Sequence, residues 1–309
     1  MNNFKKQSIA FMAIAAGKEA VESKPFPKYV GVGAVKVLTV NPTKAELSKL
    51  FPSREFTEEI NYVVDATETK PQSVRIDFWV ESIPDKNNGA EFIQKVSYFV
   101  QNSAFVNKEN TKCQYIDAIG ETAWLDKDNP VVPEGGRMSS TGLRKAYRGE
   151  ESLTKFIKAM LNIPDRGYFK DVYHQASFIK EPKDLEACYA QLEKIGNYFK
   201  GDFSELKTIV SGAVNNKLKL AFGVKTTADN KTYTDIFTDL PMKYSTSKYD
   251  YIQKVILNAK GTGRYPDTTF GENITEFKEY TITPTDLTSA PGDLGVFAEE
   301  DMPSWGAES

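Results

Sequence analysis

Basic and aromatic residues recur on one side of three predicted strands in this sequence. Successive residues of a strand point to opposite faces of a sheet, so each strand divides into two rows. In the segments 73–82, 94–102 and 216–227, one row is apolar and is typical of a core face. The opposite rows hold cations and rings, namely Arg75, Trp79, Lys95, Phe99, Lys217, Lys219 and Lys225.

Cations beside exposed rings are the side chains that suit single-stranded nucleic acid. Lysine and arginine neutralise phosphates, while unpaired bases stack on rings at about 1–3 kcal/mol per base, whatever the base. Tyr233 and Phe237 lie in the next predicted strand and would extend the same platform. The pattern therefore predicts a surface that binds single strands without sequence preference.

A purely structural interpretation of the same residues stands beside this one. Outward lysines are ordinary on strands, and Trp79 or Phe99 could lie beneath a helical layer as a second core, because large aromatic side chains are usually well buried. For Tyr115 and Trp124 the sequence favours the core outright.

The predicted elements indicate an α+β fold. A strand at 29–40 is followed by a short helix, which Thr43 and Glu46 open with capping-box spacing. Further expected elements are a hairpin at 111–125, helices at 149–163, 181–199 and 247–260, and strands at 231–238 and 276–282. Strands, then a helical block, then more strands favour an OB-fold-like β-barrel with a helical insertion, and two separate α+β domains are the alternative.

The expected organisation has three parts. Residues 1–28 form a flexible N-terminal arm, residues 29–283 form the OB-like domain with its helical insertion at about 140–200, and residues 284–309 form a disordered acidic tail. No stretch has the apolar length of a membrane span. We therefore expect no membrane partner. Cys113 and Cys188 lie far apart and are expected to be buried thiols, which fits a reducing cytoplasm.

The charge of the chain is distributed unevenly. The 39 basic and 42 acidic residues give a net charge of −3. Six of the acidic residues lie beyond Thr285, where no basic residue occurs, so the rest of the chain carries a net charge of +3. A mildly basic body with an acidic tail favours an interaction tail, and a plain solubility tail is the alternative.

Signatures of catalysis and of metal binding are weak. Cys113, Cys188 and the single histidine, His174, are scattered, whereas structural zinc ligands come in closely spaced pairs. The segment "GVGAVK" lacks the third glycine of a dinucleotide fingerprint, and "GTGRYPDTTFG" lacks a Walker-type lysine. We expect no enzyme activity, no metal and no cofactor.

Several stretches resemble a known family. "YVGVGAVKVLTVNPTKAEL", "VRIDFWVES", "FIQKVSYFVQN", "IGETAWL" and "NNKLKLAFGVKTTADNKTYTDIF" are similar to proteins of tailed phages of Bacteroidetes, including crAss-like phages. These phage proteins are described as single-stranded-DNA-binding proteins. The resemblance covers about residues 29–282.

The C-terminal peptide is similar to another feature of such proteins. Phage and bacterial single-stranded-DNA-binding proteins end on an acidic segment closed by a proline and an aromatic residue. The matching residues are Glu299, Glu300, Asp301, Pro303 and Trp305. Here "GAES" follows the ring, whereas the familiar tail ends on it.

The resemblance implies single-stranded DNA binding in phage DNA replication or recombination, in the cytoplasm of the infected bacterium. The tail would recruit phage or host replication and recombination proteins, and self-association is left open. Two rival interpretations remain at this stage. One is a virion structural or packaged cargo protein, and the other is a nucleic-acid-processing enzyme with a dispersed acidic site.

Overall fold

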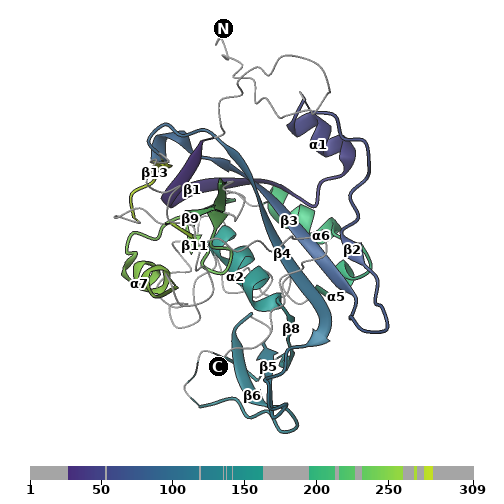
Figure 1. The fold of residues 1–309 in the computed structure, drawn as a ribbon. Helices are drawn as coiled ribbons and strands as arrows, with labels where there is room; N and C mark the ends of the chain where they lie inside the picture. The colour runs from purple at the N-terminus through teal and green to yellow at the C-terminus, as the bar shows by residue number, and fades with distance from the viewer. Residues whose placement is uncertain are drawn as a thin grey trace, which may run out of the picture.

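The computed structural model describes most of the 309-residue chain (Figure 1). It describes residues 27–162 except 53, 118, 119, 135, 137 and 141, residues 195–259 except 213–215 and 227–231, and residues 268–269 and 275–280. None of the described helices is both long and apolar enough to cross a membrane.

The described elements combine short helices with many strands. The strands are β1 (Lys28–Val40), β2 (Val63–Val64), β3 (Ser73–Ser82), β4 (Ile93–Ala104), β5 (Lys112–Ile116), β6 (Thr122–Asp126), β7 (Arg144–Lys145), β8 (Tyr147–Arg148), β9 (Lys217–Thr226), β10 (Thr232–Ile236), β11 (Met242–Lys243), β12 (Thr268–Thr269) and β13 (Lys278–Tyr280). The helices are α1 (Lys44–Leu50), α2 (Glu150–Met160), α5 (Ile195–Tyr198), α6 (Ser204–Gly212) and α7 (Asp250–Ala259), with a 3₁₀ turn, η1 (Pro84–Lys86).

One large sheet organises the fold. Its strands follow the order β10-β9-β1-β3-β4-β8, and every pairing along this path is antiparallel. Strands β11 and β12 pair with β9, β13 pairs with β1, and β2 pairs with β3. A smaller sheet has the order β6-β5-β7. The predicted α+β class is confirmed.

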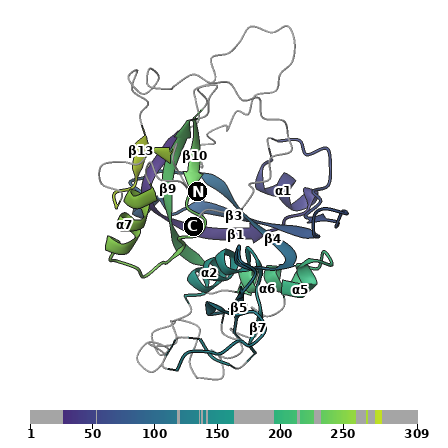
Figure 2. The same ribbon diagram turned by 60° about the horizontal axis from the view of Figure 1, so that its bottom comes forward.

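The inner face of the large sheet carries the main core. The apolar rows predicted from alternation are buried there: Val74, Ile76, Phe78, Val80, Val96, Tyr98, Val100, Leu218, Leu220, Phe222 and Val224. Helices α2 and α6 cover this face (Figure 2). Phe156 of α2 packs on Phe78, with ring centroids 4.3 Å apart.

Local sequence signals end and start the elements as expected. Thr43 accepts a hydrogen bond from the backbone N–H of Glu46, and the Glu46 side chain accepts one from Thr43, which completes the predicted capping box of α1. Asn88 and Gly89 both have positive φ in the turn before β4. The hairpin expected at 111–125 is present as β5 and β6.

The sheet curls without closing in the part that the structure describes. Along one edge β4 pairs with β3, but along its other edge it pairs with β8 only at Gln101 and Ala104. Across this seam the Tyr98 hydroxyl donates to the carbonyl of Thr238, just after β10, at 2.7 Å. The expected closed barrel is therefore not found among the described strands, because the start of α2 packs where a closing strand would pair.

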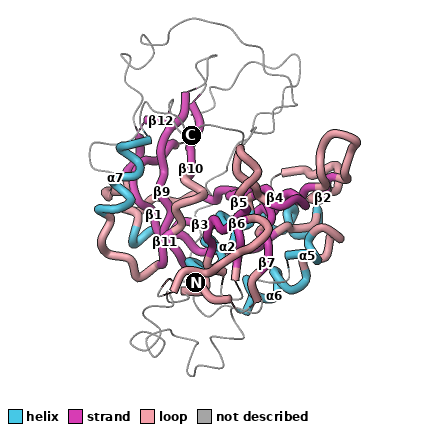
Figure 3. The backbone as a smooth tube through the Cα atoms, turned by 90° about the horizontal axis from the view of Figure 1, so that it is seen from below, coloured by secondary structure: helices cyan, strands magenta, loops and turns pink. Residues whose placement is uncertain are grey.

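Figure 3 shows how the helices are distributed about the curled sheet. Helix α7 lies beside β9 and β1 at one end, while α5 and α6 lie toward the other (Figure 3). Of the helical insertion predicted at about 140–200, α2 and α5 are described, and residues 163–194 between them lie outside the described part. Helix α6 follows the insertion and was not predicted from the sequence.

Two expectations about single residues have different outcomes. Tyr115 is buried, as predicted, but Trp124 is 41% exposed, so its assignment to the core is wrong. Trp124 lies on a strand of the small sheet, where it packs edge-on against Phe105 and leaves its other surface in solvent. The predicted N-terminal arm up to residue 26 and the whole acidic tail lie outside the described residues.

Gly149 fixes the start of α2 against β4. It has φ +88°, and a Cβ added there would overlap the backbone carbonyl of Phe99. A residue with a side chain would therefore be strained in its backbone and would also push α2 away from the strand. The contact between the start of α2 and β4 therefore requires glycine at position 149.

We expect Gly149→Ala to lower the free energy of unfolding by about 2–4 kcal/mol, from about 1–2 kcal/mol of left-handed backbone strain plus the steric overlap. Gly89→Ala is the matched control, because Gly89 has φ +79° and nothing within 4 Å of an added Cβ. Urea unfolding of both variants measures the difference. Equal losses would show that α2 does not need this close approach.

Candidate nucleic-acid interface

The strand register places the cations and rings singled out in the sequence on the outer face of the large sheet. Residues opposite each other in an antiparallel pair lie on the same side. Arg75 faces Phe99, and Trp79 faces Lys95. Three further cross-strand pairs that involve these residues or their neighbours are Lys36–Lys217, Ala34–Lys219 and Tyr233–Lys225. The predicted cations and aromatic rings therefore lie on the outer face of the sheet, opposite the core.

Part of this outer face is covered. Phe237 is 1% exposed and belongs to a second apolar cluster with Val32, Ala221 and Met242, beneath α7. The expectation that Phe237 extends an exposed platform is therefore wrong, because the small apolar residues of β1 and β9 leave room there for a helix to pack. Tyr233, near the other end of β10, is exposed opposite the exposed Lys225.

The rings on β3 and β4 differ in exposure. Trp79 is half-buried, because Phe51 at the end of α1 packs on it with ring centroids 5.0 Å apart. Its indole Nε1 is buried and has no hydrogen-bond partner among the described residues. Phe99 is 40% exposed and presents its ring to solvent. Of the two, Phe99 is the one available for stacking in this conformation.

Asp77 neutralises much of the positive charge on β3 and β4. Its buried carboxylate lies 3.2 Å from Arg75 Nε and 3.7 Å from Lys95 Nζ, and it accepts a hydrogen bond from the Ser97 hydroxyl. The backbone N–H of Asp77 donates to Asn41. Arg75 and Lys95 are thus held in an ion-pair network, which makes this half of the face less cationic than its basic residues alone suggest.

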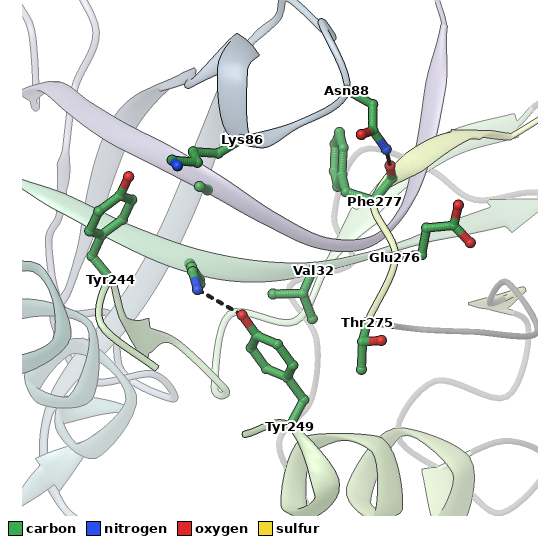
Figure 4. Close-up of a pocket in the computed structure, with 10 residues that line it drawn as sticks. Val32, Lys86, Asn88, Tyr244, Tyr249, Thr275, Glu276 and Phe277 are labelled. Carbon is green, nitrogen blue, oxygen red and sulfur yellow. Dashed lines mark hydrogen bonds between the residues drawn. The ribbon is translucent and has the colours of Figure 1, made fainter. Parts of the chain in front are cut away.

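The other half of the face contains a recess of about 450 Å³, shown in Figure 4. Lys219 lies in it with its ammonium fixed by two neutral oxygens, donating to the Thr246 carbonyl at 2.6 Å and to the Tyr249 hydroxyl at 2.7 Å. The Tyr249 hydroxyl in turn donates to Thr246. Because an ammonium carries three N–H donors, the hydrogen bonds within the described residues leave one donor of Lys219 for a ligand.

Aromatic rings surround the cations of this recess. Lys219 Nζ lies 5.3 Å from the centroid of the Tyr249 ring and 6.0 Å from that of Tyr244. Lys217 Nζ lies 5.8 Å from the Tyr244 centroid. Such cation–π contacts hold the rings and the charges together in one surface.

Uncompensated positive charge distinguishes the recess from the Asp77 network. Lys86 and Lys219, which line the recess, and Lys217, which lies beside it at Tyr244, form no ion pair with a carboxylate in the described part of the chain. Lys86 and Tyr244 lie at one side of the recess, and Glu276 lies at the other, 4.0 Å from Lys278 (Figure 4). The recess therefore attracts an anion.

Like charges also face each other beside the recess. Lys36 on β1 is directly opposite Lys217 on β9, an arrangement that destabilises a sheet. Glu81 on β3 is opposite Lys36 on its other side, but within the described residues the two form no ion pair. A bound phosphate would relieve the repulsion between the two lysines.

Of the residues that line the recess, only Lys219 was predicted as a binding residue, and the cation and the two tyrosines beside it were missed. Lys86 comes from η1, and Tyr244 and Tyr249 come from the loop between β11 and α7. The run "KYSTSKY" at 243–249, which combines lysine, tyrosine and small hydroxyl residues, was the signal that could have indicated them.

Comparisons with known proteins add no assignment. The chain matches no protein-family model, no curated protein and no solved structure. Within the described residues there is no group of three or more histidine, cysteine, aspartate or glutamate side chains that could hold a metal ion.

Asp77→Asn should lower the free energy of unfolding by about 1–3 kcal/mol, because the ion pairs with Arg75 and Lys95 lose their charge partner. Glu81→Gln is the control on the same strand and face, since Glu81 is exposed, and its effect should stay within about 0.5 kcal/mol. Thermal unfolding at low ionic strength compares them. An Asp77 variant as stable as the control would contradict a structural role for this network.

Proposed function

We propose that this protein binds single-stranded DNA, without sequence preference, along the outer face of its large sheet. The observation that carries the proposal is the ammonium of Lys219, fixed by Thr246 and Tyr249 in a recess with two tyrosine rings and, among the described residues, no carboxylate paired with it. A pre-positioned cation binds phosphate at low entropic cost. Rings beside it supply stacking for unpaired bases, which a duplex does not offer.

The strand connectivity supports the OB-type part of this proposal. Taken as strands one to five, β1, β3, β4, β9 and β10 pair so that the first contacts the second and the fourth. The second contacts the third, the fourth contacts the fifth, and α2 lies between the third and the fourth. We infer an OB-type barrel opened between its third and fifth strands.

OB folds bind oligonucleotides on the face of their second and third strands, which correspond here to β3 and β4. That face carries Arg75, Trp79, Lys95 and Phe99. A strand of DNA anchored at Lys219 would cross β1 near Lys36 to reach it. Neighbouring strands are about 4.8 Å apart, so the path from β9 to β4 is about 14 Å long.

The biological setting of the proposal comes from the sequence resemblance. This resemblance supports a role as a single-stranded-DNA-binding protein of a tailed Bacteroidetes phage, which would act in DNA replication or recombination inside the infected bacterium. The acidic tail would recruit partner proteins through Trp305 and the carboxylates of Glu299, Glu300 and Asp301. These tail residues lie outside the described part of the chain, so this proposal rests on the sequence.

Lys219→Met should weaken binding to labelled oligo-dT and should reduce the slope of log K against log salt by about 0.7, the change expected when a protein neutralises one phosphate fewer on a single strand. Lys36→Met, at an exposed position, should lower the slope by a similar amount without affecting folding. Lys70→Met, exposed in the turn before β3, is the control. Fluorescence anisotropy across a salt series measures all three.

Two results would contradict the proposal that the protein binds single-stranded DNA through this face. One is a wild-type chain that shows no salt-sensitive affinity for oligo-dT. The other is a Lys219 variant whose slope and affinity match those of the Lys70 control.

Removal of residues 284–309 should tighten binding to oligo-dT at low salt, because the acidic tail would otherwise compete with phosphate for the same cations. The gain should shrink as salt is added and screens the charges. Full-length and truncated chains are compared by the same anisotropy titration. Identical affinities at low salt would argue against competition by the tail.

A further inference from the structure

A second pocket, of about 360 Å³, lies at the open seam of the sheet. It is bounded by the edge of β4 that pairs with β8, by the first turn of α2 and by the turn that follows β10. Its lining residues are Ser97, Tyr98, Phe99, Gln101, Phe105, Gln114, Arg148, Gly149, Glu151, Ser152, Lys155, Thr238 and Asp239. We call it the seam pocket.

Aromatic rings form part of the wall of the seam pocket. Phe99 comes from the outer face of β4, and Phe105 follows the end of that strand. The guanidinium of Arg148 lies 5.1 Å from the centroid of the Phe105 ring. Trp124 packs edge-on against Phe105 at 4.9 Å and extends the aromatic surface out of the pocket. A planar ligand can stack against this wall.

A buried amide forms a polar part of the lining. Gln114 is 3% exposed, and its Nε2 donates to the carboxylate of Glu151. Because a carboxylate only accepts hydrogen bonds, this contact fixes the orientation of the amide. Gln114 Oε1 is then left buried without a hydrogen-bond partner among the described residues. A buried acceptor in this state is unfavourable, and a hydrogen bond from a ligand N–H would remove that penalty.

The charges of the seam pocket balance. Arg148 and Lys155 line the pocket together with Glu151 and Asp239, and Lys155 Nζ lies 2.6 Å from Glu151 Oε1. Burial alone would raise the pKa of Glu151, but the hydrogen bonds and charge of Lys155, with hydrogen bonds from Gln114 and Thr122, hold the pKa below its usual value. The carboxylate therefore stays ionised at neutral pH, and the pocket has no excess positive charge for a phosphate.

We propose that the seam pocket binds one nucleobase of the bound single strand, which rests on the proposed DNA-binding function. A base is planar, uncharged and able to stack on Phe99 or Phe105. Every base has an N–H donor on its pairing edge that could reach Gln114 Oε1, so the contact requires no particular sequence. Because this oxygen exposes less than 1 Å², a movement of surface side chains, such as the half-exposed Lys155, accompanies binding.

The two sites would then bind different parts of one DNA strand. The recess around Lys219 binds phosphate, and the seam pocket binds a base. Phe99 and Lys95 lie on the same row of β4, about 13 Å apart along the strand, so the outer face leads directly to the pocket.

The test compares oligo-dT with an oligomer of the same length made of abasic deoxyribose phosphates. Wild-type chain should prefer oligo-dT. Phe99→Ala and Gln114→Met should each weaken oligo-dT binding about tenfold, as expected when one base is no longer held, with the affinity for the abasic oligomer and the salt slope unchanged. Tyr251→Ala, which removes a ring that is 71% exposed on α7, is the control.

A second measurement does not depend on variants. Oligo-dT with 5-iodouracil is cross-linked to wild-type chain by ultraviolet light, and the adducts are mapped by mass spectrometry. Adducts on Phe99 or Phe105 are expected. The seam-pocket proposal alone would be overturned if wild-type chain binds oligo-dT but the adducts lie elsewhere, and if the Phe99 variant still prefers oligo-dT to the abasic oligomer as strongly as wild type does. Absence of any oligonucleotide binding would overturn the proposed function as well.

Discussion

Burial of alternate apolar rows on the inner face of the large sheet is the constraint from which the rest of the structure follows. Val74, Ile76, Phe78 and Val80 can be buried together only in one register, since a slip by one residue would turn the row toward solvent. The same register decides the outer face. Arg75 comes to lie opposite Phe99 and Trp79 opposite Lys95 because their neighbours fill the core.

The outer face has two electrostatic regions that follow from where carboxylates lie. On β3 and β4, the buried Asp77 binds Arg75 and Lys95 and turns cations into a structural network. Around Lys219, neutral oxygens hold the ammonium, so its charge stays available to a ligand. Both regions contain basic residues, and they differ in the groups that bind those residues. A carboxylate binds the cations of the first region, and neutral oxygens bind Lys219 in the second.

The open seam links the fold to a second kind of site. Gly149 lets α2 start against the backbone of β4, and the hydroxyl of Tyr98 bridges to Thr238 where a closed barrel would have paired strands. The space left at this seam is lined by rings and by an amide with an unused acceptor. Incomplete closure of the sheet thus creates a pocket that a fully paired barrel would not have.

The sequence by itself determined the longer strands of the large sheet, the capping box of α1 and the side of the sheet on which Arg75, Trp79, Lys95 and Phe99 lie, because periodicity and capping are local properties of the chain. It did not indicate the two-residue strands β2, β7, β8, β11 and β12. Tertiary structure alone decided that Phe237 is buried under α7, that Trp124 is exposed, and that the recess and the seam pocket exist. Each of these depends on which distant segment packs on a given face. The local alternation of apolar and polar residues does not show which segment that will be.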